Sequence, residues 1–372
     1  MTPPSRLRDP NLTPLARKLA GRIVSAGPIT LHDYMEACLY DPDHGYYRVK
    51  AGIGQRGDFI TAPEISQVFG ELIGLWAAEV WRQMGEPAAV RLIELGPGRG
   101  ALMADALRAL RVAPLFLKSA RVHLIEASAP LMEAQRGALS GVPAAVSWHK
   151  DLGEVPAGPA ILIANEFFDC LPVRQFVFDG GRKQWRERMV AFEDGAFRFA
   201  LDSADGTPAP LAPGLPPVEH GEILEQRCVR SVMEAIAART PFAALIIDYG
   251  YALPSLGDTV QAVRRHRFTD LFDAPGETDL TAHVDFLHLK QAAANANLKA
   301  FGPMPMGEWL LRLGLEARLG QLLSRASRAE ARDIHSRAAR LVDPVQMGAL
   351  FKVLALTNGI STPPPPFVAG TG

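Results

Sequence analysis

Short apolar runs recur through the middle of the chain, each separated from the next by a segment long enough for a helix. Two of them, residues 161–164 and 245–247, contain no polar side chain. A strand buried on both faces is apolar throughout, whereas a half-exposed strand alternates apolar and polar residues. Apolar strands with helix-length spacers are typical of βαβ units. The sequence therefore predicts an α/β fold with a doubly wound, mostly parallel sheet. The expected strands are residues 90–95, 121–127, 145–148, 160–164 and 244–248.

Four regions are expected along the 372 residues. Residues 1–85 form an N-terminal helical region with an active-site loop, and residues 86–303 form the sheet core, with an insertion at about 173–240 after the fourth strand. Residues 304–357 are expected to be helical. Residues 358–372 include four consecutive prolines and are expected to be disordered.

Turn and helix signals add detail within these regions. In the insertion, residues 174–178 and 184–192 alternate like the strands of a hairpin, with Gly180 and Gly181 at its turn. Helices are expected at residues 30–39, 63–84, 222–239, 306–313, 316–326 and 328–342.

The charge balance argues against nucleic acid as a partner. The formal net charge is −1, so the whole chain offers no bulk attraction to a polyanion or to an anionic membrane. A local basic patch remains an option at Arg264, Arg265, His266 and Arg267.

The cysteines and histidines indicate neither disulfides nor a metal site. Cys38, Cys170 and Cys228 are widely spaced and odd in number, which fits a reducing compartment. His283 and His288 are five residues apart and do not share a helical face. We therefore expect no bound metal.

The N-terminus has two interpretations. Residues 1–27 are basic and partly amphipathic, as in a mitochondrial transit peptide. We prefer a structural first helix, because Thr13 is a good N-cap and Pro14 suits the first helical position. No apolar run approaches the length of a bilayer span, so stable membrane insertion is not expected.

A glycine-rich loop is the strongest local signal. Residues 94–100, ELGPGRG, follow an expected strand and open an expected helix near Arg99. Glycines let the backbone turn tightly and approach a ligand, and a helix N-terminus presents unpaired N–H groups. Gly96, Gly98 and Ala101 also satisfy the looser dinucleotide pattern, and a purely structural turn is the third interpretation.

Two acids narrow the choice of ligand. Glu94 stands at the carboxyl end of the strand, where it would repel a pyrophosphate but suits the ammonium group of a methionine moiety. Glu126 ends the next strand, where an acid can accept hydrogen bonds from both ribose hydroxyls of a nucleoside. Asp151 and Leu152 follow the third strand, where an adenine would be contacted; a turn cap is the equal alternative for Asp151.

Residues 165–169, NEFFD, follow the fourth strand and should face the same crevice as the glycine loop. We interpret Glu166 as a site residue in preference to a helix cap. For Phe167 and Phe168, core packing and site lining fit equally well. Upstream, residues 57–64, GDFITAPE, read on physical grounds as a helix-entry loop with Thr61 as N-cap.

Several motifs together resemble the MidA-like family of S-adenosylmethionine-dependent methyltransferases. They cover roughly residues 31–351 in the expected order: GDFITAPE (57–64), FGEL (69–72), ELGPGRG (94–100), NEFFD (165–169), DYG (248–250) and DLTAHVDF (279–286). This family has a Rossmann-like, class I methyltransferase fold. It includes a mitochondrial complex I assembly factor that makes symmetric dimethylarginine on a complex I subunit. The resemblance implies S-adenosyl-L-methionine as cofactor and a protein as substrate.

The resemblance also implies site residues, carried over by motif. The loop glycines and Glu94 would hold the methionine part, Glu126 the ribose, and the 57–64 loop and NEFFD would close over cofactor and acceptor. The expected cofactor-binding residues are Glu94, Gly96, Pro97, Gly98, Gly100, Glu126, Asp151, Leu152, Asn165, Asp58 and Thr61. Glu166 is the expected catalytic carboxylate, with Asp169, Glu64 or Asp58 as its partner; a pair of carboxylates can hold a guanidinium by bidentate hydrogen bonds.

Other functions remain open at this point. An NAD-dependent oxidoreductase, a small-molecule N- or O-methyltransferase and a non-catalytic assembly factor are the alternatives. The helical additions at both ends favour a macromolecular acceptor, and the apolar helix around residues 76–81 fits either a homodimer or the core. We expect a cytoplasmic protein if the source is bacterial and a mitochondrial matrix protein if it is eukaryotic.

Overall fold

The computed structural model describes residues 12–49, 61–202, 215 and 217–368. The chain folds into two compact units. The larger unit takes residues 53–168, 229–252 and 284–372, and the smaller unit takes residues 1–52, 169–228 and 253–283. These units do not follow the predicted boundaries at residues 85 and 303. Each unit is assembled from three segments that are far apart in the sequence. A unit therefore does not correspond to one continuous range of residues, as the prediction assumed.

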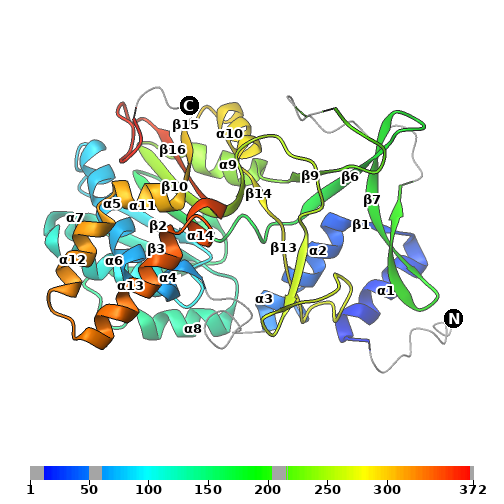
Figure 1. The fold of residues 1–372 in the computed structure, drawn as a ribbon, viewed down its shortest axis with the longest axis horizontal. Coiled ribbons are helices and arrows are strands. Elements are labelled where there is room, and N and C mark those ends of the chain that lie inside the picture. The colour runs from blue at the N-terminus through cyan, green and yellow to red at the C-terminus, as the bar shows by residue number, and fades with distance from the viewer. Residues whose placement is uncertain (1–11, 50–60, 203–214, 216, 369–372) are drawn as a thin grey trace. The chain divides into compact units, whose positions relative to one another are not determined.

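The larger unit is built on a mixed sheet with strand order β15-β16-β10-β5-β2-β3-β4 (Figure 1). The strands from β10 to β4 are mutually parallel, and the short β14 pairs parallel with β10. The prediction of a doubly wound, mostly parallel sheet is confirmed. The bounds are β2 Val90–Leu95, β3 Ala120–Ile125, β4 Ala145–His149, β5 Ala160–Asn165, β10 Phe242–Tyr251, β14 Val284–Asp285, β15 Lys299–Pro305 and β16 Phe351–Asn358.

The sheet order reverses between β2 and β5, which are direct neighbours with Leu95 opposite Ala164. In doubly wound sheets, ligands bind at the carboxyl ends of the strands beside such a reversal. The predicted glycine loop after β2 and the NEFFD segment after β5 therefore leave the same end of adjacent strands. Leu162 and Ile163 on β5 point to opposite faces and are both fully buried, as an internal parallel strand requires.

Two strands on the β10 side of the sheet, β15 and β16, were not predicted. β16 runs antiparallel between β10 and β15, and Figure 1 shows this C-terminal strand beside β10. Residues 304–357 are thus not wholly helical. The segment after β16 is also ordered up to Val368: Phe367 is 5% exposed, and the Trp76 indole N–H donates to the Pro365 carbonyl at 2.7 Å. The disorder expected for residues 358–372 is wrong for this part, because an aromatic side chain and a hydrogen bond anchor it.

The helices of the larger unit cover the sheet. The expected helix at residues 63–84 is two helices, because Ser66 is extended and its hydroxyl caps the second helix at Val68 N. The bounds are α4 Ala62–Ile65, α5 Gln67–Gln83, α6 Ala101–Ala109, η2 Leu110–Val112, α7 Pro114–Ser119, α8 Ala129–Ala138, η3 Leu152–Glu154, α9 Arg230–Ala237, α10 Phe286–Asn295, α11 Met306–Arg312, α12 Leu315–Leu323, α13 Arg328–Val342 and α14 Met347–Leu350.

Helix α5 packs in the core of the larger unit. Trp76 and Trp81 are 1% and 6% exposed and pack in the same core as Leu92 and Ile161 of the sheet. Of the two interpretations of this helix, the core is correct, and these tryptophans are not available to a homodimer.

The smaller unit combines helices with antiparallel strands. The predicted hairpin is confirmed, since β6 and β7 pair with Phe178 opposite Trp185. The helix expected at residues 222–239 is wrong in its first half, where Ile223–Arg227 forms β9 against β6. The bounds are α1 Pro14–Ala26, β1 Ile29–Thr30, α2 Leu31–Tyr40, α3 Tyr46–Val49, β6 Val173–Asp179, β7 Gln184–Glu193, β8 Ala196–Leu201, β9 Ile223–Arg227, β11 Gln261–Arg264, β12 Arg267–Phe268 and β13 Asp279–Thr281.

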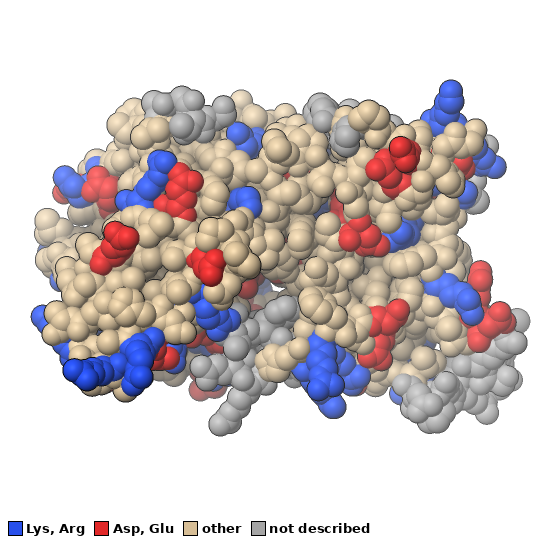
Figure 2. All heavy atoms as spheres, in the orientation of Figure 1, with Lys and Arg blue, Asp and Glu red and all other residues tan. Residues whose placement is uncertain are grey.

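Charges of both signs are interspersed on the face shown in Figure 2. The basic segment at residues 264–267 is partly neutralised, because Arg264 forms an ion pair with Glu277 at 2.7 Å. Arg265 and His266 form the turn between β11 and β12, each with a positive φ. In the described part of the chain, no helix is both long and apolar enough to cross a bilayer.

Candidate functional site

The loop between β2 and α6 has the open backbone that its glycines predicted. Gly96, Gly98 and Gly100 have φ values of 59°, 53° and 85°, a region that side chains with a Cβ rarely adopt. A Cβ built on Gly96 would lie 3.1 Å from the Phe167 ring. Gly100 N donates to the Pro97 carbonyl at 2.8 Å, and helix α6 begins directly after this turn at Ala101. The loop therefore exposes main chain where a ligand can approach.

Glu94 lies beneath this loop with an unsatisfied carboxylate. Its side chain is 3% exposed, and its Oε2 accepts no hydrogen bond from any described residue. Burial raises the pKa of Glu94 to about 8. A buried carboxylate without a partner destabilises the free protein, and a ligand ammonium group would supply the missing partner. The residue predicted for the methionine end fits that role.

Glu126 belongs to a hydrogen-bonded network behind the loop. Its Oε1 accepts from Ser128 N at 2.7 Å, and its Oε2 accepts from the Gln135 side-chain amide at 3.1 Å. The same amide of Gln135 donates to the Gly98 carbonyl at 2.8 Å, and the Gln135 Oε1 accepts from the Trp148 indole at 2.9 Å. Gln135 is fully buried on α8 and links the glycine loop to the predicted ribose acid.

Sequence reasoning missed Gln135. The only signal was a polar residue on the inward face of an amphipathic helix, and such a residue has no identifiable partner until the fold is known.

Two residues predicted near the adenine have other contacts. The Asp151 carboxylate accepts from Gly153 N at 2.6 Å and caps the short helix η3. The capping interpretation is thus confirmed, whereas contact with adenine stays a prediction. Leu152 is 8% exposed, and its carbonyl accepts from the Arg239 guanidinium at 3.0 Å.

Glu166 sits at a strained position directly after β5. Its φ is 49°, in the left-handed region that residues other than glycine rarely adopt. Residues with such strained backbone angles occur most often at functional sites. Its backbone N–H continues the sheet by donating to the Ile247 carbonyl. Its Oε1 accepts from Ala62 N at 3.2 Å and from the Asn165 amide at 3.3 Å. The fold thus brings Glu166 to the start of α4.

The two aromatics of NEFFD separate into the two roles that the sequence left open. Phe168 is fully buried and belongs to the core, and its backbone N–H donates to Asp248 at 3.0 Å. Phe167 is partly exposed and lies against Gly96. Asp248, the acid of the DYG motif, is itself fully buried and also accepts from Tyr249 N. It positions the backbone of the NEFFD segment.

Thr61 directly precedes Ala62, the residue whose backbone N–H donates to Glu166. Thr61 is the N-cap residue of α4, but its hydroxyl makes no capping hydrogen bond. Asp58 lies outside the described residues. Asp169 is the first residue of the second segment of the smaller unit. It is 6% exposed, and its carbonyl accepts from Ala282 N at 3.0 Å.

Glu64 lines a cavity of about 960 Å³ between α4, α6 and the C-terminal helices α12 and α13. Its lining is largely polar and carries both signs of charge, including Arg99, Asp105, Asp333 and Arg337. Asp333 and Arg337 form an ion pair at 2.7 Å along α13. The helical additions at both ends of the chain therefore meet beside the glycine loop.

The chain is similar to known methyltransferases over most of its length. The model of a family described as S-adenosyl-L-methionine-dependent methyltransferases matches residues 72–304. The chain is 37% identical to the "Protein arginine methyltransferase NDUFAF7 homolog, mitochondrial" of Drosophila melanogaster, over 93% of this chain and 85% of the relative. It is 35% identical to the corresponding Homo sapiens protein, over 93% and 83%. A crystal structure from Burkholderia thailandensis with S-adenosyl-homocysteine bound matches with a TM-score of 0.80 at 29% identity, over 93% of this chain and 92% of that one.

Proposed function

The chain belongs to the family of S-adenosyl-L-methionine-dependent methyltransferases, and from this premise we propose that it methylates an arginine side chain of a protein. The family match confirms the resemblance that the sequence motifs indicated, and it excludes the alternative of an NAD-dependent oxidoreductase. The relatives from Drosophila melanogaster and Homo sapiens are both named as mitochondrial protein arginine methyltransferases.

The observation that carries the cofactor site is the buried carboxylate of Glu94 under the glycine loop. In this proposal, Glu94 accepts a hydrogen bond from the methionine ammonium, and Glu126 accepts hydrogen bonds from the ribose. Gly96, Pro97, Gly98 and Gly100 keep the main chain open to the ligand. Further contacts are assigned to Asp151, Leu152, Asn165, Thr61 and Asp58. When bound, the cofactor supplies an activated methyl group.

Glu166 is the proposed catalytic carboxylate. It would hold the acceptor guanidinium by charge-assisted hydrogen bonds, localise its positive charge and accept the proton that the methylated nitrogen releases. Its φ of 49° and the hydrogen bond that it accepts from Ala62 N hold the carboxylate at the start of α4. Asp169 and Glu64 are the proposed second carboxylates. The protein's contribution is mainly to position the acceptor.

The proposed acceptor is a subunit of respiratory complex I, methylated symmetrically during assembly. The mitochondrial relatives and the motif resemblance support this proposal. The polar cavity between α4, α6 and α13 is a suitable place for a segment of a protein substrate. The proposed location is the cytoplasm of a bacterium or the matrix of a mitochondrion.

Mass spectrometry of complex I subunits tests the acceptor. Cells with and without this protein are compared, and a dimethylarginine present only with the active protein is the expected result. If instead a purified small molecule is methylated and no subunit changes, the acceptor assignment is wrong.

The Glu166→Gln variant tests the mechanism. We expect S-adenosyl-homocysteine affinity within about two-fold of the wild type and turnover lower by at least about 100-fold, because general-base and charge-assisted contacts are lost. Isothermal titration and a methyl-transfer assay measure the two quantities. Glu193→Gln, which changes an exposed carboxylate at the end of β7, is the matched control. Full turnover in Glu166→Gln would remove this residue from the mechanism.

A further inference from the structure

Two of the motif segments, DYG (248–250) and DLTAHVDF (279–286), take no direct part in the proposed chemistry. The structure brings part of each together at the carboxyl end of β10, within the larger unit. There β14 pairs parallel with β10, with Gly250 opposite Val284. The two segments therefore build one feature, the end of β10, which is paired with the end of β5.

The end of β10 is held in one position by β14. A Cβ built on Gly250 would lie 2.0 Å from the Val284 carbonyl oxygen, so this close approach of the two strands requires glycine. Val284 is fully buried. The next residue, Asp285, caps helix α10 by accepting from His288 N at 2.9 Å. β14 thus joins the end of β10 to the start of α10.

Asp248 takes the place of a main-chain acceptor where the ladder between β5 and β10 ends. The last paired residues are Asn165 and Ile247. Beyond this pair, Glu166 N donates to the Ile247 carbonyl at 2.9 Å, and Phe168 N donates to Asp248 Oδ2 at 3.0 Å. Asp248 is fully buried, so water does not compete for its hydrogen bond with Phe168.

These two hydrogen bonds bracket the unusual backbone of Glu166. The bonded N–H groups belong to residues 166 and 168, so the backbone angles of Glu166 and Phe167 must carry the chain from one acceptor to the next. Glu166 does this with a φ of 49°, which a residue with a Cβ keeps only where its surroundings impose it. In this conformation its Oε1 accepts from Ala62 N at 3.2 Å.

We propose that Asp248 is a positioning residue for methyl transfer. Its carboxylate holds Phe168 N, imposes the left-handed conformation of Glu166 and so directs the Glu166 carboxylate to the start of α4. This inference rests on the proposed catalytic role of Glu166. The competing explanation is that burial of the Phe168 ring imposes the turn without Asp248, and the two explanations differ in the effect of Asp248→Ala.

Thermal unfolding tests whether Asp248 imposes the turn. Glu166→Gly and Glu166→Ala both remove the carboxylate, but only glycine adopts a positive φ without cost. We therefore expect the Tm of Glu166→Gly to exceed that of Glu166→Ala by at least about 2 °C. In the Asp248→Ala background this difference should vanish or reverse, because the chain is free to leave the strained conformation. An unchanged difference would show that the burial of Phe168 is sufficient, and the proposal would be wrong.

A kinetic double-mutant cycle tests whether Asp248 acts through Glu166. Methyl transfer to isolated complex I subunits from cells lacking this protein is the assay. Asp248→Ala should lower kcat about 10- to 100-fold and leave the affinity for S-adenosyl-homocysteine within about three-fold of the wild type. Asp248→Asn keeps one acceptor oxygen for Phe168 N and should retain more activity. In Glu166→Gln, adding Asp248→Ala should lower kcat by less than about two-fold, because the group that it positions is already lost.

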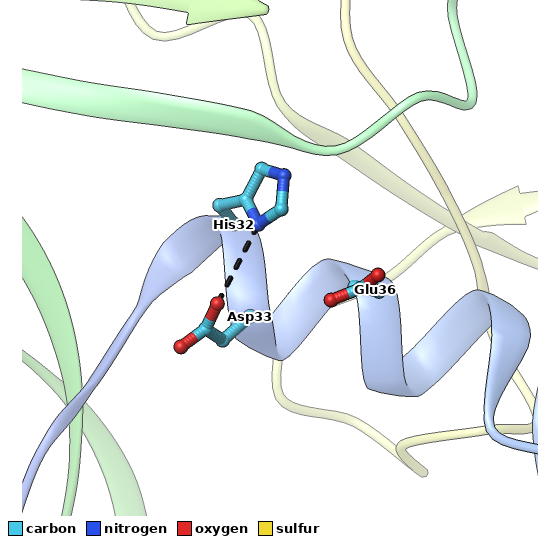
Figure 3. Close-up of side chains that lie close together, drawn as sticks. All are labelled: His32, Asp33 and Glu36. Carbon is cyan, nitrogen blue, oxygen red and sulfur yellow. Dashed lines mark ion pairs between the residues drawn. The ribbon is translucent and has the colours of Figure 1, made fainter. Parts of the chain in front are cut away.

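Two control variants separate positioning from a general loss of charge or stability. Glu36→Ala removes an exposed carboxylate on α2, beside His32 and Asp33 (Figure 3). Val353→Ala removes a buried side chain on β16, opposite Ile247 of β10. Both should keep the kcat of the wild type, although Val353→Ala lowers the Tm.

The outcomes keep this inference apart from the proposed function. Fold losses in kcat that multiply between Asp248→Ala and Glu166→Gln would mean that Asp248 does not act through Glu166, and the positioning role would be rejected. If Glu166→Gln alone turns over like the wild type, the proposed mechanism fails. The Tm comparison would then still show whether Asp248 imposes the turn.

Discussion

At the residue scale, the proposed cofactor site includes single side chains in energetically unfavourable environments. Glu94 is a buried carboxylate without a described partner, and Glu166 is a non-glycine residue with a positive φ. Both features destabilise the free protein, and both are retained where the loop after β2 meets the segment after β5. Such local costs are typical of sites that a ligand completes.

Replacement of Glu94 by glutamine tests this interpretation through its pH dependence. Burial raises the pKa of Glu94 from 4.5 to about 8, so the folded carboxyl keeps its proton at pH values where the unfolded one has lost it. The free wild type should therefore lose stability as the pH rises from about 4.5 towards 8, and Glu94→Gln should not. Thermal unfolding without ligand across this range measures the difference.

The same variant should bind the cofactor less well. A hydrogen bond to a charged group contributes about 1.5–3 kcal/mol, so we expect about ten- to hundred-fold weaker S-adenosyl-homocysteine binding in titration calorimetry. Equal affinity of Glu94→Gln and the wild type at pH 8 would show that Glu94 does not meet the ammonium group.

At the element scale, helix α8 and the strands β3 and β4 hold the glycine loop in place. Gln135 on α8 bonds at once to the loop carbonyl of Gly98, to Glu126 and to Trp148 on β4. On the same strands, His123 and His149 share a hydrogen bond of 2.9 Å. These contacts fix the distance between the glycine loop and the end of β3.

Gln135 should act as a positioning residue. In Gln135→Met the side chain keeps its length but loses all three hydrogen bonds, so the loop and Glu126 are no longer tied together. We expect KM for S-adenosyl-L-methionine to rise at least about ten-fold, with a smaller change in kcat. Gln321→Met, on the exposed face of α12, is the control. An unchanged KM contradicts this role, and so does a loss of activity that appears in kcat alone.

The histidine pair predicts acid sensitivity of the sheet edge. Burial, and to a smaller extent the charge of the nearby His149, lowers the pKa of His123 from 6.5 to about 4. As the pH falls from 6.5 to 4, the unfolded chain binds a proton that the folded chain does not, so stability is lost in that window. His123→Asn should show a shallower decline of unfolding free energy in urea titrations between pH 7 and 5. A parallel decline in both proteins would contradict the assignment.

At the scale of the whole molecule, one unit holds every described residue that we assign to the cofactor. Hydrogen–deuterium exchange should therefore gain most protection, on addition of S-adenosyl-homocysteine, in peptides covering residues 94–104, 126–135 and 165–168. Dialysis of the ligand should reverse the effect. Protection centred on β6 to β9 of the smaller unit would place the cofactor elsewhere and contradict our assignment.

The sequence by itself determined the elements whose signals are local. Fully apolar runs predicted the parallel strands, because a strand buried on both faces has no polar position. Alternate glycines predicted the loop after β2. Thr13 and Thr30 predicted the starts of two helices, and the hydroxyl of each residue caps its own helix. The position of Glu166 after β5 followed from chain order and the rules of doubly wound sheets.

Only the tertiary structure decided which distant segments pair. The strand β16 joins the sheet beside β10, and residues 223–227 form a strand because β6 offers them an edge. Residues 353–356 are apolar, as in the other buried strands, but an apolar run does not identify the strand that it pairs with. The contacts of Gln135 and the different surroundings of Phe167 and Phe168 depend in the same way on three-dimensional neighbours. Hydrogen bonding and burial between distant residues are set by packing, which a one-dimensional pattern does not contain.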